Sequence, residues 1–163
     1  MSAANANPIV GTLLHQLDMA FEGEHWHSLM RNLASTAAED WDWAPPGGKR
    51  TIRDIVCHVG ACKLMLENKL VGDRRLTWED PYVSGQAQAM GGIDAALAWL
   101  REANATFRAG VARLADADLP VLRQGYWDEP RETRWSVEVI IQHDLYHAGE
   151  INLIRALHQG NDA

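Results

Sequence analysis

The sequence predicts an all-α protein, a four-helix bundle with long connections between the second and third helices and between the third and fourth. Two observations carry this prediction. Four long segments repeat apolar residues at the three- and four-residue spacing of a helix face, and hardly any segment alternates as a strand does. Because the chain has 163 residues and no repeat or linker-like stretch, residues 1–163 are expected to form a single bundle domain.

The first predicted helix covers roughly residues 9 to 37. Its apolar stripe is formed by Val10, Leu13, Leu14, Leu17 and Phe21. Glu24 and Ser28 continue the same face and His25 flanks it, so the stripe becomes polar in the second half of the helix. Two interpretations of Glu24 and His25 stay open: they belong to a functional site, or they are ordinary solvent-exposed side chains.

The remaining helices are predicted over roughly residues 52 to 71, 92 to 115 and 136 to 158. Thr51 and Asp54 have the capping-box spacing at the start of the second helix. The third helix keeps a regular apolar face without metal-ligating residue types and is interpreted as scaffold. Gly160 follows the fourth helix as an expected stop signal.

The two long connections cover about residues 72 to 91 and 116 to 135, and loops of that length are usually functional or locally structured. They are too long for simple antiparallel hairpins, which leaves an overhand arrangement of the helices open. Both contain aromatic residues: Trp78, Tyr82, Tyr126, Trp127 and Trp135. These side chains either line a pocket over a functional site or cap the ends of the bundle.

Composition limits the classes of partner. The hydrophobic content of 47% and the charged content of 23% are those of a soluble globular protein. A net charge of −7 argues against a nucleic-acid partner, which would require a basic surface. No signal peptide and no run of about 18 apolar residues is visible, so a cytoplasmic protein without a membrane partner is expected. Cys57 and Cys62 fall on different faces of one predicted helix and are expected to be reduced.

The most informative feature is a pair of histidines, His143 and His147, on the predicted buried face of the fourth helix. That face also carries Ile140, Ile151 and Ile154. An unsatisfied buried polar group costs about 1–3 kcal/mol, so the ring nitrogens need partners. Side chains four residues apart on a helix are neighbours, and both rings can therefore direct a lone pair at one point. A divalent metal satisfies both rings, whereas a lone histidine on such a face is more often a hydrogen-bonded flanking residue.

A third ligand is available from the second predicted helix. His58 lies on the margin of an apolar stripe formed by Ile52, Ile55, Val59, Cys62 and Leu66. If this helix packs against the fourth, the edge position directs His58 into the groove between them. Cys62 either replaces or joins His58, or it is a small buried hydrophobic residue.

Three imidazoles suit zinc, nickel or a similar borderline divalent metal. Three protein ligands leave a coordination position for water, the pattern of catalytic rather than structural zinc. Such a site activates either a bound water or a thiolate. Asp54, Asp144 and Glu150 are candidates to orient the imidazoles through hydrogen bonds, although each is also explained as a solvated helix charge. No catalytic side chain is assigned.

The residues DIVCHVG, containing His58, and QHDLYHAGEI, containing His143 and His147, resemble the motifs of the DinB/YfiT-like superfamily of metal-dependent enzymes. The resemblance extends over nearly the whole chain and includes the connection WDWAPPGGK and the residues Trp135 and Ser136. It implies a four-helix bundle with a metal-binding His triad. Glu150 departs from the pattern, since many relatives have Gln at this position.

The resemblance implies one chemistry and leaves others open. Characterised relatives include transferases and isomerases that use a low-molecular-weight thiol such as mycothiol or bacillithiol, acting on a small-molecule substrate. Hydrolysis by a metal-activated water requires the same three ligands, so a thiol S-transferase or isomerase and a hydrolase both stay open. A non-catalytic metal-binding or stress-response bundle is the alternative.

A metalloprotease is disfavoured, although HDLYH has the spacing of the H-E-x-x-H motif. Asp144 is shorter than the usual general base, and too little chain follows His147 for a distant third ligand. The family resemblance also implies a homodimer, and Trp99 lies off the main apolar stripe of the third helix, where an exposed aromatic residue would serve an interface.

Overall fold

A computed structural model describes residues 7–24, 26–125, 127 and 129–161, and its regular structure is mostly helical. The four longest helices are α1 (Pro8–Glu22), α3 (Ile52–Leu70), α6 (Ile93–Ala112) and α7 (Thr133–Gln159). Short helices α2 (Leu29–Ala34), α4 (Pro81–Ser84) and α5 (Gln86–Met90) lie in the connections. A 3₁₀ turn (Asp116–Asp118) precedes two antiparallel strands, β1 (Leu122–Arg123) and β2 (Arg131–Glu132).

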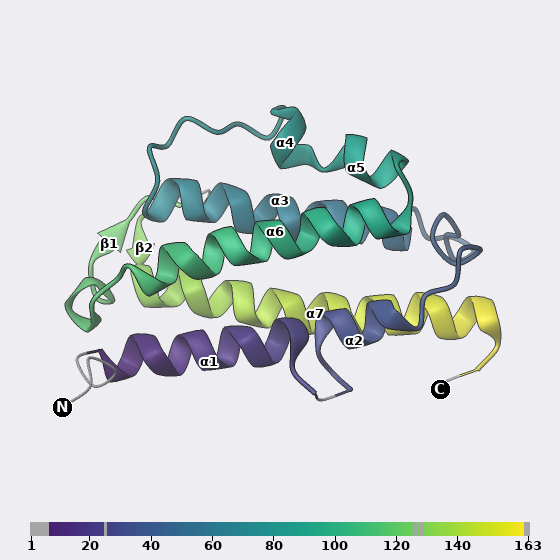
Figure 1. The fold of residues 1–163 in the computed structure, drawn as a ribbon, viewed down its shortest axis with the longest axis horizontal. Helices are drawn as coiled ribbons and strands as arrows, with labels where there is room; N and C mark the ends of the chain where they lie inside the picture. Colours follow the sequence, from purple (N-terminus) through teal and green to yellow (C-terminus); the bar gives the residue numbers. More distant parts are fainter. Residues whose placement is uncertain (1–6, 25, 126, 128, 162–163) are drawn as a thin grey trace.

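The long helices lie side by side with α1 and α7 running in one direction and α3 and α6 in the opposite direction (Figure 1). Helix α3 packs against α6 and α7, while α1 packs against α7 and α6. Because α3 and α6 run the same way, the connection between them returns along the length of the molecule, and it forms α4 and α5 on the way (Figure 1). This connection lies on the side of α3 and α6 away from α7.

The prediction of one first helix over residues 9 to 37 is wrong, because the chain breaks between α1 and α2. Gly23 leaves the helix in an extended conformation, with φ −66° and ψ 164°. A Cβ at Gly23 would lie 2.5 Å from the carbonyl oxygen of Met19, so the close approach requires glycine. The Ser28 hydroxyl donates to the Gly23 carbonyl at 2.9 Å and closes the break. Glu24 is exposed, and His25 lies outside the described residues.

The other three long helices begin and end within a few residues of the predicted limits. At the start of α3, the Asp54 N–H donates to Thr51 Oγ1 and the Thr51 N–H donates to Asp54 Oδ2, which confirms the predicted capping box. Helix α7 begins at Thr133, three residues before the predicted start at 136, and Gly160 ends it in the left-handed conformation with φ 68°. Among the described residues, no helix is both long and apolar enough to cross a membrane.

Trp99 is buried, which contradicts the expectation of an exposed aromatic residue on the third helix. Its indole N–H donates to the Tyr82 carbonyl at 2.9 Å, and its ring lies against Gly60 of α3 and Gly85 between α4 and α5. The helical periodicity of α6 gave no indication that the returning connection covers this face. An exposed Trp99 therefore no longer supports the predicted homodimer, which stays a prediction.

Candidate metal centre

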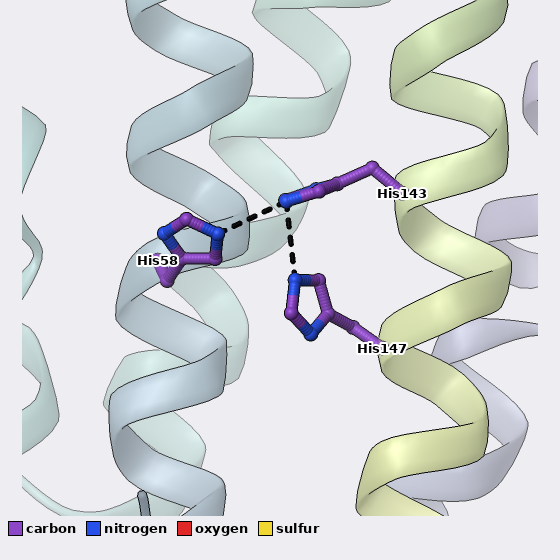
Figure 2. Close-up of side chains that lie close together, drawn as sticks. All are labelled: His58, His143 and His147. Carbon is purple, nitrogen blue, oxygen red and sulfur yellow. Dashed lines mark hydrogen bonds between the residues drawn. The ribbon is translucent and has the colours of Figure 1, made fainter.

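The three predicted ligands converge between α3 and α7, although His58 is distant in sequence from the other two (Figure 2). His143 Nε2 lies 3.0 Å from His58 Nε2 and 3.1 Å from His147 Nε2. One nitrogen from each ring lies within 4.8 Å of the others, a spacing compatible with a common metal ion. The three rings come together because His58 lies at the edge of the apolar face of α3 and because His143 and His147 are four residues apart on α7.

All three imidazoles are held in the neutral form, which is the form that binds metals. Burial, together with the neighbouring His147 and His58 rings, lowers the pKa of His143 to about 3. Burial, together with His58 and Arg50, lowers the pKa of His147 to about 4. The pKa of His58 is also lowered, by burial and Arg50, against an opposing effect of Glu150. At neutral pH the rings therefore present lone pairs rather than charge.

The hydrogen bonds within the cluster cannot satisfy all three rings. His147 Nδ1 lies 2.7 Å from Glu150 Oε2, so the one N–H of neutral His147 lies at Nδ1 and its Nε2 carries a lone pair. His143 Nε2 faces the Nε2 atoms of His58 and His147. If it carries a proton, it can donate to only one of them. If it carries no proton, its lone pair faces the lone pair of His147 Nε2. Nδ1 of His143 is buried and has no hydrogen-bond partner among the described residues. A cation that accepts three lone pairs removes the conflict between the Nε2 atoms.

The centre lies near one edge of the α3–α7 interface. His147 is 2% exposed, whereas His58 and His143 are half-buried. Glu150 links His147 to Arg50, whose Nη1 lies 3.5 Å from Glu150 Oε2. The ring of Tyr146, an exposed residue, meets the His147 ring edge to face at 4.9 Å. Arg50 and Tyr146 therefore lie beside the centre, and Glu150 is positioned to fix the orientation of His147.

The other residues predicted to orient the ligands have different partners. Asp54 forms the capping box with Thr51. Asp144 is fully buried, and its Oδ2 accepts from Lys63 Nζ at 2.6 Å. Neither carboxylate contacts a triad ring in the structure, and a role for them in orienting the ligands stays a prediction.

Cys62 is buried, as expected of a small hydrophobic residue, and its Sγ lies 3.8 Å from His58 Nδ1 and 3.9 Å from His58 Nε2. It does not belong to the group of side chains that meet at a common point, which among the described residues contains only the three histidines. Its position beside the His58 ring makes it a packing neighbour of this ligand.

Sequence reasoning missed two residues near the centre. Lys63, five residues beyond His58 on α3, is fully buried and pairs with Asp144 of α7. A lysine inside the run ACKLML was a visible signal for this, because an unpaired buried lysine is rare. Arg50 reaches Glu150 across 100 positions of chain, and no local pattern could have indicated that contact.

The described aromatic residues of the two connections lie in two separate parts of the structure. Tyr82 belongs to α4, on the side of α3 away from α7, and Trp78 precedes α4 in the same connection (Figure 1). Trp127 and Trp135 pack edge to face beside the two strands, with their ring centroids 4.6 Å apart. Trp135 lies eight residues before His143. Tyr126 lies outside the described residues. The expectation that these side chains line a pocket over the triad stays a prediction.

A mostly helical fold with three converging imidazoles defines a helical protein with a candidate divalent-metal centre. The chain belongs to the DinB superfamily: the family's sequence profile matches residues 23–151, a stretch that contains all three histidines. A comparison with curated proteins found no match.

Proposed function

We propose that this DinB-superfamily protein binds a divalent metal ion through His58, His143 and His147, zinc or nickel being the expected ions. The observation that carries the proposal is the convergence of three neutral imidazoles whose Nε2 atoms lie 3.0 and 3.1 Å apart in succession. Imidazole is a common ligand of both ions. The proposed architecture around this centre is a single-domain four-helix bundle formed by α1, α3, α6 and α7.

We further propose that the protein is an enzyme of the thiol S-transferase or isomerase type, or of the hydrolase type. A divalent ion at this position would supply Lewis-acid activation of a thiol or of water. The described residues offer three ligands to the common point and no fourth, which leaves room for a small molecule. The half-buried rings of His58 and His143 make that position reachable from solvent, and Glu150 holds the Nδ1 proton of His147.

The thiol-dependent chemistry is supported by the family resemblance and by the guanidinium of Arg50, which pairs with Glu150 beside the centre. Such a guanidinium favours an anionic substrate or thiolate nearby. The non-catalytic metal-binding bundle differs from the enzyme only in turnover. The two are therefore separated by measurements of thiol binding and of product formation.

The first experiment measures metal content by elemental analysis after purification without added metal. We expect near-stoichiometric zinc or nickel in the natural chain and strong loss in His143→Ala and His147→Ala. His15→Ala is the matched control, because His15 is an exposed histidine of α1 outside the triad. Equal trace metal in all four proteins, with unchanged circular dichroism, would refute the metal centre.

The second experiment replaces the native ion with Co²⁺ and adds a low-molecular-weight thiol. A thiolate-to-cobalt charge-transfer band that is lost in His147→Ala supports the thiol-dependent enzyme, and conjugation of the thiol to an electrophile supports it further. Hydrolysis of an ester or amide without thiol supports the hydrolase. A bound metal with neither thiol binding nor turnover would support the non-catalytic bundle instead.

A further inference from the structure

A pocket lies between α2 and the C-terminal part of α7, separate from the triad. It has a volume of about 530 Å³, within the usual range for small-molecule sites, and its lining includes Arg31, Arg155, Asn32, Asn152, Ser35 and Trp26. None of these residues is acidic, although the chain carries a net charge of −7. Arg155 lies eight residues beyond His147, which corresponds to about 12 Å along the helix.

The guanidinium of Arg155 is a buried charge without an anionic partner among the described residues. The residue is 3% exposed, and no salt bridge joins it to a carboxylate among the described residues. Its Nη1 donates to Gln159 Oε1 and Asn161 Oδ1, and its Nη2 donates to Asn152 Oδ1, all neutral oxygens. Nε of Arg155 is buried and has no hydrogen-bond partner within the described part of the chain. Arginine stays charged, so the charge and the Nε–H donor of this side chain are not compensated by any described residue.

Other polar side chains of the pocket also offer positive charge or N–H donors. Arg31, exposed on α2, adds a second guanidinium to the pocket and also lacks a salt bridge among residues 7–24, 26–125, 127 and 129–161. Asn152 uses its Oδ1 for Arg155, which leaves its amide NH₂ as a donor at the pocket wall. Arg155 lies near the C-terminal end of α7, and the helix dipole there stabilises a positive charge. The dipole does not provide a hydrogen-bond acceptor for the Arg155 Nε–H.

We propose that this pocket binds a small oxyanion, a carboxylate or phosphate group of a metabolite. Two guanidinium groups and an amide donor provide the charge and the directed N–H groups that such a group requires. The indole of Trp26, exposed at the rim, is placed to cover an attached apolar or aromatic part of the ligand. This site is independent of the proposed metal centre.

The test titrates the full chain with inorganic phosphate and, separately, with succinate at constant ionic strength set by potassium chloride. Calorimetry gives the affinity, and the ¹H–¹⁵N signal of the Arg155 Nε–H reports the site. We expect saturable binding of at least one anion with a shift of that signal. Arg31→Gln should weaken it by about tenfold, the effect of losing one charge-assisted contact. Arg155→Met should abolish it.

Arg74→Gln is the matched control, because Arg74 is exposed, forms no salt bridge among the described residues and lies outside this pocket. It should leave the affinity unchanged, and His147→Ala should retain anion binding even if metal is lost. Binding of phosphate alone or succinate alone identifies the anion and supports the site. The proposal is overturned if neither anion binds saturably, or if Arg31→Gln and Arg74→Gln behave alike. Arg31→Gln keeps the test valid if Arg155→Met fails to fold.

Discussion

Lys63 Nζ lies 2.6 Å from Asp144 Oδ2, and neither side chain exposes any surface. The pair joins α3 to α7, the two helices that carry the triad, and Asp144 directly follows His143. Burial opposes both charges: it lowers the pKa of Lys63 and raises that of Asp144, while their mutual attraction counters each effect. The ion pair therefore fixes the relative position of the helices through groups that can be stable only together.

Removing one member of this pair should be far more harmful than removing both. In Lys63→Met the Asp144 carboxylate stays buried without its cation, and we expect a loss of about 3–5 kcal/mol in the free energy of unfolding. The double variant Lys63→Met, Asp144→Leu should recover most of that loss, because two apolar side chains leave no uncompensated charge. Urea denaturation measures both. A double variant no more stable than Lys63→Met would contradict this account.

Glu150 should control metal affinity through its hydrogen bond with His147 Nδ1. Glu150→Ala removes the acceptor, and we expect the affinity to fall by about 10- to 100-fold. Glu150→Gln should have a smaller effect, because the amide oxygen can still accept the proton. Competition with a chromophoric chelator measures the affinities, and Glu138→Ala, an exposed residue of the same helix, is the control. Equal affinities in Glu150→Ala and Glu138→Ala would exclude the role of Glu150.

Two mid-helix glycines should respond to alanine with opposite signs. A Cβ at Gly60 would lie 2.4 Å from two ring atoms of Trp99, and such overpacking costs about 1–3 kcal/mol. Gly149 has no atom within 4 Å of a Cβ position, so Gly149→Ala should stabilise the protein by about 0.5–1 kcal/mol. Thermal and urea denaturation compare the two variants. Stabilisation in both would show that the Trp99 ring moves aside at little cost.

Asp40 should make stability depend on pH at the acidic end. Burial raises its pKa, but hydrogen bonds from His158, the Ala37 N–H and Gln159 outweigh this effect and hold the pKa below the ordinary 3.8. A carboxyl with a depressed pKa stabilises the fold above its unfolded pKa, and this contribution is lost as the pH falls through the lower folded value.

Asp40→Asn should therefore lower the free energy of unfolding by about 1.5–3 kcal/mol near pH 7, and the difference from the natural chain should shrink near pH 3. Urea denaturation at both pH values measures it. A difference that stays constant between them would show that the charge of Asp40 contributes nothing.

The sequence was sufficient to predict the parts of the site that depend on helical periodicity. The spacing of His143 and His147 and the edge position of His58 follow from the helical repeat, and the structure brings these rings together. The break at Gly23 was missed because the stripe continues through Ser28 with the same period. The burial of Trp99 was missed because the residues that cover it, Tyr82 and Gly85, come from a connection whose path no local pattern defines.

The Trp99 contact has a consequence for how the chain is assembled during synthesis. Helix α3 contacts α7 on the face that carries His58. At Gly60 it contacts the indole of Trp99, which lies some forty positions later in the chain. During synthesis, the face of α3 that carries Gly60 therefore stays uncovered until Trp99 has been made. The face that carries His58 stays uncovered until His147 has been made. The cluster of imidazoles is among the last features to form, so a truncated nascent chain should be unable to hold an ion prematurely.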